Sequence, residues 1–128
     1  MKLLLDTHAF IWLNTQPSRL STKVVELLSS GIHDVYLSMA SPWEMQIKSQ
    51  LGKLLLNLSL DELIEISINT NNINILPIEF KHISYLSKLP LHHNDPFDRI
   101  IIAQALSENM TVISADSAFS QYQVPLIW

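Results

Sequence analysis

The chain has 128 residues and a hydrophobic fraction of 48%, so it can form one core but is too short for two ordinary domains. It contains no cysteine, which excludes disulfides, thiol nucleophiles and cysteine-ligated zinc or iron–sulfur sites. The first apolar run is too short for a signal peptide, and no window approaches a transmembrane helix, so we expect a cytoplasmic protein with no membrane partner. The net charge is −4, whereas proteins that bind nucleic acid by bulk charge are usually basic. The location of the acidic residues therefore matters.

Short apolar runs alternate with segments of helical spacing in the first third of the chain. Lys2–Leu5 is predicted to be a strand buried on both faces, followed by a short helix over His8–Asn14 that Thr7 would cap. A second helix is expected from about residue 21 to residue 30. Asp34–Ser38 has the β-branched and aromatic residues of a second strand.

The middle of the chain continues the same alternation. Ser-Pro-Trp-Glu at residues 41–44 has the form of a capping box with proline at the first helical position, and predicts a helix that ends at Gly52. Ser59 opens a further helix to about residue 69 by the same rule. Ile73–Leu76 is predicted to be a third strand, and residues 79–88 a helix.

Residues 95–103 are the most informative stretch of the sequence. Asp95 stands where a helix cap belongs, Pro96 follows at the first helical position, and an almost wholly apolar helix is expected to run to about Asn109. Asp98 comes three residues after the cap. Two interpretations are open for Asp98: it completes a capping box, or it leans into a cleft and binds a metal ion.

The C-terminal part adds two more strands. Thr111–Ser114 is a predicted fourth strand, residues 117–122 a short helical turn, and Pro125–Trp128 a last strand that begins or lies at an edge because of its proline. Alternating strands and helices predict an α/β domain over residues 1–128. Its expected form is three-layer α/β/α, with a short central parallel β-sheet.

Four acidic residues fall where such a sheet binds ligands, outside the carboxyl ends of its strands. Asp6 and Asp116 follow the first and fourth strands. Glu44 and Asp98 are expected at the third position of helices that begin near the same edge. Each alone has a structural explanation as a cap or as a polar residue leaving a strand. Together they predict one acidic cleft.

Such a cluster requires a counter-charge. Two carboxylates about 5 Å apart repel by roughly 3 kcal/mol at an effective dielectric constant near 20. Carboxylate oxygen is the ligand type of Mg²⁺ and Mn²⁺, so one or two such ions are expected. Ions of this kind polarise phosphoryl oxygens and activate water, and the chemistry that follows is phosphodiester hydrolysis.

The motifs, taken in order, resemble those of PIN-domain ribonucleases, and most closely the VapC-type toxins of toxin–antitoxin pairs. The resemblance covers essentially the whole chain, and the stretch from Asp95 to Arg99 is its most specific part. The matching motifs are Leu5-Asp6-Thr7-His8, Ser41-Pro42-Trp43-Glu44 with Gly52-Lys53-Leu54, His92-His93-Asn94-Asp95-Pro96-Phe97-Asp98-Arg99, and Ser114-Ala115-Asp116.

The resemblance implies a PIN-like fold and a Mg²⁺- or Mn²⁺-dependent endoribonuclease that hydrolyses RNA. It also implies a homodimer and a cognate antitoxin that inserts a segment into or near the acidic groove. By position, the catalytic and metal-binding residues are Asp6, Glu44, Asp98 and Asp116.

Six further residues are candidates for orienting these ligands or contacting RNA: Asp95, Ser114, Thr7, Arg99, Lys48 and His93. Ordinary structural roles remain open for several of them. Asp95 can serve as the helix cap, Arg99 can form an ion pair with a carboxylate, and Lys48 has helix-pair spacing from the preceding glutamate. The histidines can be surface residues, and the three tryptophans can belong to the core or to a dimer interface.

Two other functions stay open: a non-catalytic protein-binding module of the same fold, and a metal-dependent phosphatase on a similar sheet. Haloacid-dehalogenase-type enzymes require Asp-x-Asp after the first strand, where this chain has Asp6-Thr7-His8. A receiver domain requires an acidic pair near the first strand and a lysine after the last one, and neither is present.

Overall fold

The computed structural model describes residues 1–128, and its five strands form one sheet in which every pair is parallel. The strand order is β3-β2-β1-β4-β5. The chain therefore builds outward from β1 to β3 and then crosses to the other side of β1. The gap between the carboxyl ends of β1 and β4 is the point where strand order reverses, which is where open α/β sheets bind ligands. The strands are β1 (Lys2–Leu5), β2 (Asp34–Ser38), β3 (Ile73–Leu76), β4 (Thr111–Ile113) and β5 (Leu126–Ile127).

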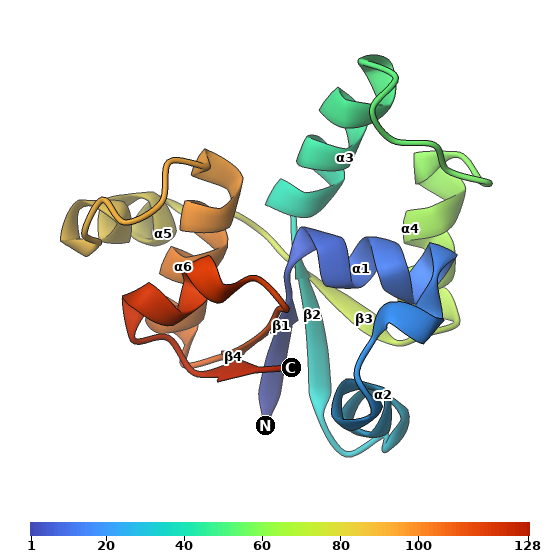
Figure 1. Cartoon of the computed structure of the whole chain (residues 1–128), viewed down its shortest axis with the longest axis horizontal. Helices are drawn as coiled ribbons and strands as arrows, with labels where there is room; N and C mark the ends of the chain where they lie inside the picture. The colour runs from blue at the N-terminus through green and yellow to red at the C-terminus, as the bar shows by residue number, and fades with distance from the viewer.

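Helices cover both faces of this sheet, which confirms the three-layer α/β/α prediction (Figure 1). One face carries α1 (Thr7–Thr15), α2 (Thr22–Ser29) and α4 (Leu60–Asn69). The other face carries α5 (Phe80–Tyr85) and α6 (Pro96–Glu108). Helix α3 (Ala40–Gln50) follows β2 and stands beyond the end of the sheet, where it contacts α1, α4 and α6. Three short 3₁₀ helices complete the fold: η1 (Pro17–Arg19), η2 (Leu86–Lys88) and η3 (Ser117–Tyr122).

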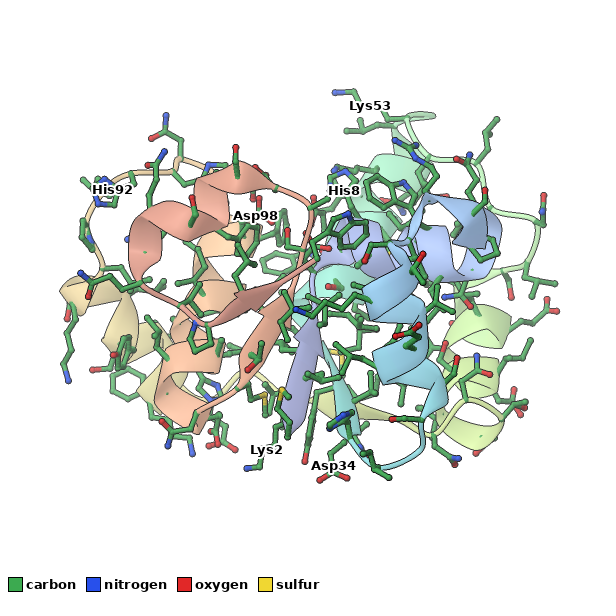
Figure 2. All side chains as sticks on the ribbon, turned by 60° about the horizontal axis from the view of Figure 1, so that its bottom comes forward. Lys2, His8, Asp34, Lys53, His92 and Asp98 are labelled. Carbon is green, nitrogen blue, oxygen red and sulfur yellow. The ribbon has the colours of Figure 1, made fainter.

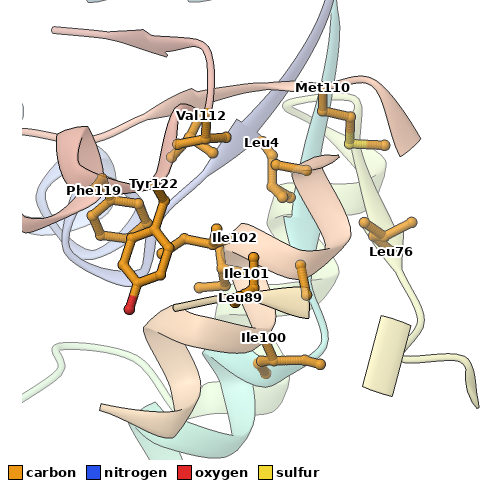
Figure 3. Packing of buried hydrophobic residues seen from close by; sticks show 14 residues of the cluster. Leu4, Leu76, Leu89, Ile100, Ile101, Ile102, Met110, Val112, Phe119 and Tyr122 are labelled. Atoms are coloured by element: carbon orange, nitrogen blue, oxygen red, sulfur yellow. The ribbon is translucent and has the colours of Figure 1, made fainter. Parts of the chain in front are cut away.

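The hydrophobic core lies in two parts, one on each face of the sheet. Leu3 and Leu5 of β1 pack into the cluster with α1 and α2, whereas Leu4 packs into the cluster with α6. This split follows from the alternation of side chains along a strand. Residues 100–105 of α6 are all buried, and Figure 3 shows its isoleucines packed among Leu4, Val112, Phe119 and Tyr122. A helix this uniformly apolar is a central element rather than a surface one.

The predicted start of α6 is confirmed. Asp95 is the N-cap, and its Oδ1 accepts hydrogen bonds from the backbone N–H groups of Phe97 (2.8 Å) and Asp98 (3.2 Å). Pro96 occupies the first helical turn, as expected. Asn109 ends the helix in a left-handed conformation with φ 55°. The segment predicted as one helix over residues 79–88 is instead α5 followed by η2.

Two predicted helix starts are wrong, and both errors concern the site. Helix α1 is capped by Asp6 and not by Thr7. Helix α3 begins at Ala40, before the predicted capping box, and Glu44 is therefore its fifth residue rather than its third. The earlier start is possible because Ser38 Oγ accepts a hydrogen bond from the Ala40 N–H at 3.1 Å, which satisfies one free donor of the first turn. No helix combines the length and hydrophobicity that crossing a lipid bilayer requires.

Candidate functional site

The four predicted acids come from two strand ends and two helices. Asp6 directly follows β1, and Asp116 lies three residues beyond the end of β4. In Figure 2, Asp98 lies at the end of the molecule opposite Lys2 and Asp34, which mark the amino ends of β1 and β2. The site therefore occupies the point of strand reversal that the sheet order defines.

Asp6 is buried and held by two hydrogen bonds. Its Oδ1 accepts from the Ala9 N–H at 2.7 Å, and its Oδ2 accepts from Ser114 Oγ at 2.5 Å. Burial raises the pKa of Asp6, against the lowering effect of the bonds from Ser114 and Ala9, and the charge of Asp116 raises it further. Ser114 Oγ also accepts from the Asp116 N–H at 3.0 Å, so one hydroxyl connects the acids that follow β1 and β4.

Asp98 does not complete a capping box. Its Oδ2 lies 2.9 Å from His93 Nε2, while Asp95 alone caps the helix. Burial raises the pKa of Asp98 to about 6; the charges of Asp95 and Glu44 act in the same direction, and the hydrogen bond from His93 opposes them. Of the two interpretations of this stretch, the structure therefore favours an Asp98 side chain that faces the other acids.

Glu44 approaches the cluster from α3. It is only 3% exposed, and its Oε2 forms a 2.8 Å salt bridge with Lys48 Nζ one turn later in the helix. Its Oε1 is buried and has no hydrogen-bond partner. Burying a carboxylate oxygen without a partner is unfavourable unless the oxygen binds a cation or accepts a hydrogen bond.

Two of the four acids, Asp98 and Asp116, lie within ligand distance of each other, whereas Asp6 and Glu44 are outside that group. Ligand atoms of His93, Asp98 and Asp116 all lie within 4.8 Å of one another. The charge of Asp116 acts on Asp6, and that of Glu44 acts on Asp98. The unpartnered oxygen of Glu44 and the raised pKa values of Asp6 and Asp98 fit a site that a divalent ion would complete. The catalytic and metal-binding roles of the four acids stay predictions.

The candidate supporting residues have different surroundings. Thr7 Oγ1 lies 2.9 Å from Ser41 Oγ in a buried contact that joins α1 to α3. Arg99 forms no ion pair: it donates to the Pro90 carbonyl at 2.8 Å and to the Tyr122 hydroxyl at 3.2 Å. The expected ion pair is wrong because successive helix residues point about 100° apart, so Arg99 faces away from the acids.

Tyr122 is a residue that sequence reasoning missed. Its hydroxyl accepts a hydrogen bond from the His93 N–H at 2.8 Å as well as the one from Arg99, so it fixes the loop before α6. No local pattern marks a tyrosine in η3 for this role. Trp43 is not a core residue, since it is 60% exposed and packs edge-on against Phe97 with ring centroids 5.0 Å apart.

Comparisons with known proteins bear on the fold and the family of this chain. The family model described as "PIN domain" matches residues 3–125. VapBC2 from Rickettsia felis, solved with a promoter DNA fragment, is 17% identical over 99% of this chain and 98% of that chain, with a TM-score of 0.76. FitAcB from Neisseria gonorrhoeae is 25% identical over 98% of this chain and 96% of that chain, with a TM-score of 0.68.

A third solved structure has the same fold. VapBC-5 from Mycobacterium tuberculosis, a member of the VapBC family of toxin–antitoxin systems, is 18% identical over 98% of this chain and 97% of that chain, with a TM-score of 0.62. No curated protein matches the sequence significantly. Because the family model covers nearly the whole chain, this protein belongs to the PIN domain family, which confirms the resemblance carried by its acidic motifs.

Proposed function

We propose that this protein is a metal-dependent endoribonuclease that hydrolyses RNA phosphodiester bonds, and that it is the toxin of a toxin–antitoxin pair. The observation that supports the proposal is the closeness of Asp98 and Asp116 to His93, with Asp6 linked to Asp116 through Ser114 and the charge of Glu44 acting on Asp98. Membership of the PIN domain family supports nuclease activity, and the acidic cluster supports its dependence on metal.

These four carboxylates would hold one or two Mg²⁺ or Mn²⁺ ions. A divalent ion bound there supplies Lewis-acid polarisation of a phosphoryl oxygen and eases the deprotonation of water. Neutralisation of the acids also removes the repulsion that an RNA phosphate would otherwise meet at this end of the molecule.

The chain's own residues keep the acids in place before substrate arrives. The Ser114 hydroxyl orients Asp6 Oδ2 and holds the Asp116 backbone. Lys48 neutralises Glu44 and, at about one-third exposure, has access to a phosphate at the rim of the site. Asp95 fixes the first turn of α6, from which Asp98 projects. Such pre-organisation lowers the reorganisation that catalysis requires.

The proposal includes a cognate antitoxin, a homodimer and a cytoplasmic location. Support for the antitoxin comes from the similar VapBC structures. Support for apolar contact with another chain comes from large exposed apolar side chains in α3, at its two ends and in the loop after it. These residues are Met39, Trp43, Leu51 and Leu55, and they are 47%, 60%, 63% and 89% exposed.

The test is cleavage of several RNAs in the presence of Mg²⁺ or Mn²⁺, with and without EDTA. We expect cleavage by the wild type with metal, none in EDTA, and a loss of at least about 100-fold for Asp98→Asn. Asp34→Asn, an exposed carboxylate at the opposite end of the sheet, is the matched control and should keep full activity.

Each other result identifies an alternative. Equal cleavage in EDTA would rule out the metal mechanism. Intact RNAs in every condition, together with binding to a partner protein, would favour the non-catalytic module. Hydrolysis of a small phosphomonoester without RNA cleavage would favour the phosphatase.

A further inference from the structure

His93 is the one nitrogen ligand in the cluster at the end of the sheet. It lies in the loop before α6, and its Nε2 is 2.9 Å from Asp98 Oδ2. Ligand atoms of His93, Asp98 and Asp116 form a triangle with no side longer than 4.8 Å. Ligands about 2.0–2.2 Å from one ion lie about 3–4.4 Å apart, so a small shift of these side chains lets all three reach a single ion.

The loop that carries His93 is fixed from behind. The Tyr122 hydroxyl accepts the His93 N–H at 2.8 Å, and Arg99 donates both to that hydroxyl and to the Pro90 carbonyl. His92, the neighbouring histidine, packs on the Tyr122 ring instead, with ring centroids 5.3 Å apart. These contacts fix the backbone of the loop, and the His93 ring itself is held by its contact with Asp98.

A second observation is that one oxygen of the nearby acid Glu44 is not satisfied by the protein. Glu44 lies 97% buried, its charge acts on Asp98, and its Oε1 has no hydrogen-bond partner. Lys48 occupies only the other oxygen, Oε2. A buried carboxylate oxygen of this kind points to a ligand that the protein itself does not supply.

We propose that His93 Nε2 is a direct metal ligand together with Asp98 and Asp116, which makes the site selective for transition-metal ions such as Mn²⁺ or Zn²⁺ over Mg²⁺. The inference rests on the proposed metal site and names the class of ion that the site prefers. Imidazole nitrogen suits Zn²⁺ most; Mn²⁺ is a transition-metal ion that accepts nitrogen as well as carboxylate oxygen, and Mg²⁺ prefers an all-oxygen set. The ring must present an unprotonated Nε2, so the tautomer with hydrogen on Nδ1 is the one that binds.

The alternative is that His93 donates Nε2–H to Asp98 and only orients that ligand. The two roles give different results in metal titrations by calorimetry, performed without RNA. For a direct ligand, His93→Gln should weaken Mn²⁺ and Zn²⁺ binding at least about 10-fold and change Mg²⁺ binding less than about 3-fold. For an orienting residue, the three ions should lose affinity equally. His92→Gln is the matched control and should leave all three affinities unchanged.

Electron spin-echo spectroscopy of bound Mn²⁺ is the direct readout. The wild type and His92→Gln should show coupling to a coordinated nitrogen, and His93→Gln should lose it while keeping the wild-type circular dichroism spectrum. Absence of nitrogen coupling in the wild type, or its persistence in His93→Gln, would overturn the proposal.

The outcomes separate this inference from the proposed function. If the wild type binds Mn²⁺ through oxygen alone and still cleaves RNA, the histidine ligand is wrong and the nuclease stands. If the wild type and Asp98→Asn bind no divalent ion at millimolar concentration, both proposals lose their basis.

Discussion

Replacing Asp98 by asparagine should stabilise the protein when no divalent ion is present. Burial raises the pKa of this carboxyl from 3.8 to about 6, helped by the charges of Asp95 and Glu44. The side chain is only 16% exposed, so solvent screens these effects weakly. One pKa unit corresponds to about 1.36 kcal/mol. The difference between the two pKa values of Asp98 therefore makes its ionised form unfavourable in the folded protein by about 3 kcal/mol at neutral pH.

The pH dependence follows from the direction of the shift. A carboxyl whose pKa is raised by folding binds more protons in the native state than in the unfolded state at pH values between the two pKa values. The contribution of Asp98 to the free energy of unfolding therefore falls as pH rises from about 4 to about 6, and stays low above that. The wild type and Asp98→Asn should differ at pH 7 and become similar near pH 4.

The expected gain is smaller than the full electrostatic term because asparagine makes a weaker hydrogen bond to His93 than a carboxylate does. We expect Asp98→Asn to raise the free energy of unfolding by about 1–3 kcal/mol at pH 7, or Tm by about 3–10 °C. Urea titrations in EDTA at pH 7 and pH 4 measure this, with Asp34→Asn as the control. A less stable Asp98→Asn at pH 7, or a difference unchanged at pH 4, would refute the electrostatic reasoning.

Three other predictions concern the site and its support. Millimolar Mn²⁺ should raise the Tm of the wild type, because a ligand that binds only the native state stabilises it; a melting curve identical in Mn²⁺ and EDTA would contradict a clustered site. Ser114→Ala removes the hydroxyl that donates to Asp6, and should lower the free energy of unfolding by about 1–3 kcal/mol in urea titrations. His82→Ala deletes a fully buried ring whose Nε2 lies 2.9 Å from Glu108 Oε1. This variant should lower the free energy of unfolding by about 2–4 kcal/mol in the same titrations. A change below about 0.5 kcal/mol would show that this contact between α5 and α6 is dispensable.

The elements of this fold are readable in the sequence because each carries its own local signal. Lys2–Leu5 and Ile73–Leu76 are short apolar runs between turn residues, and the structure has strands with those bounds. Asp95 and Pro96 define the start of α6 because capping depends only on groups within one turn.

The same local rules failed where a distant contact competes with them. The motif at residues 41–44 has the form of a capping box, yet Ser41 is used for a buried contact with Thr7, 34 residues away. Helix α3 begins earlier, at Ala40, whose N–H is bound by Ser38 Oγ. Asp6 likewise caps α1 in addition to accepting a hydrogen bond from Ser114. Local capping rules therefore fail where a distant residue engages the side chain that the rule uses.

The sequence by itself determined the α/β alternation and the parallel sheet, because strand and helix signals extend over only a few residues. It also placed two acids after strands and two near the starts of helices. Only the tertiary structure decided that β4 lies beside β1, which brings Ser114 to Asp6 across 108 residues of chain. It also decided that His93 faces Asp98 and that Glu44 keeps an unpartnered oxygen. The physical reason is that these contacts depend on how whole elements pack, and no short window of sequence contains that information.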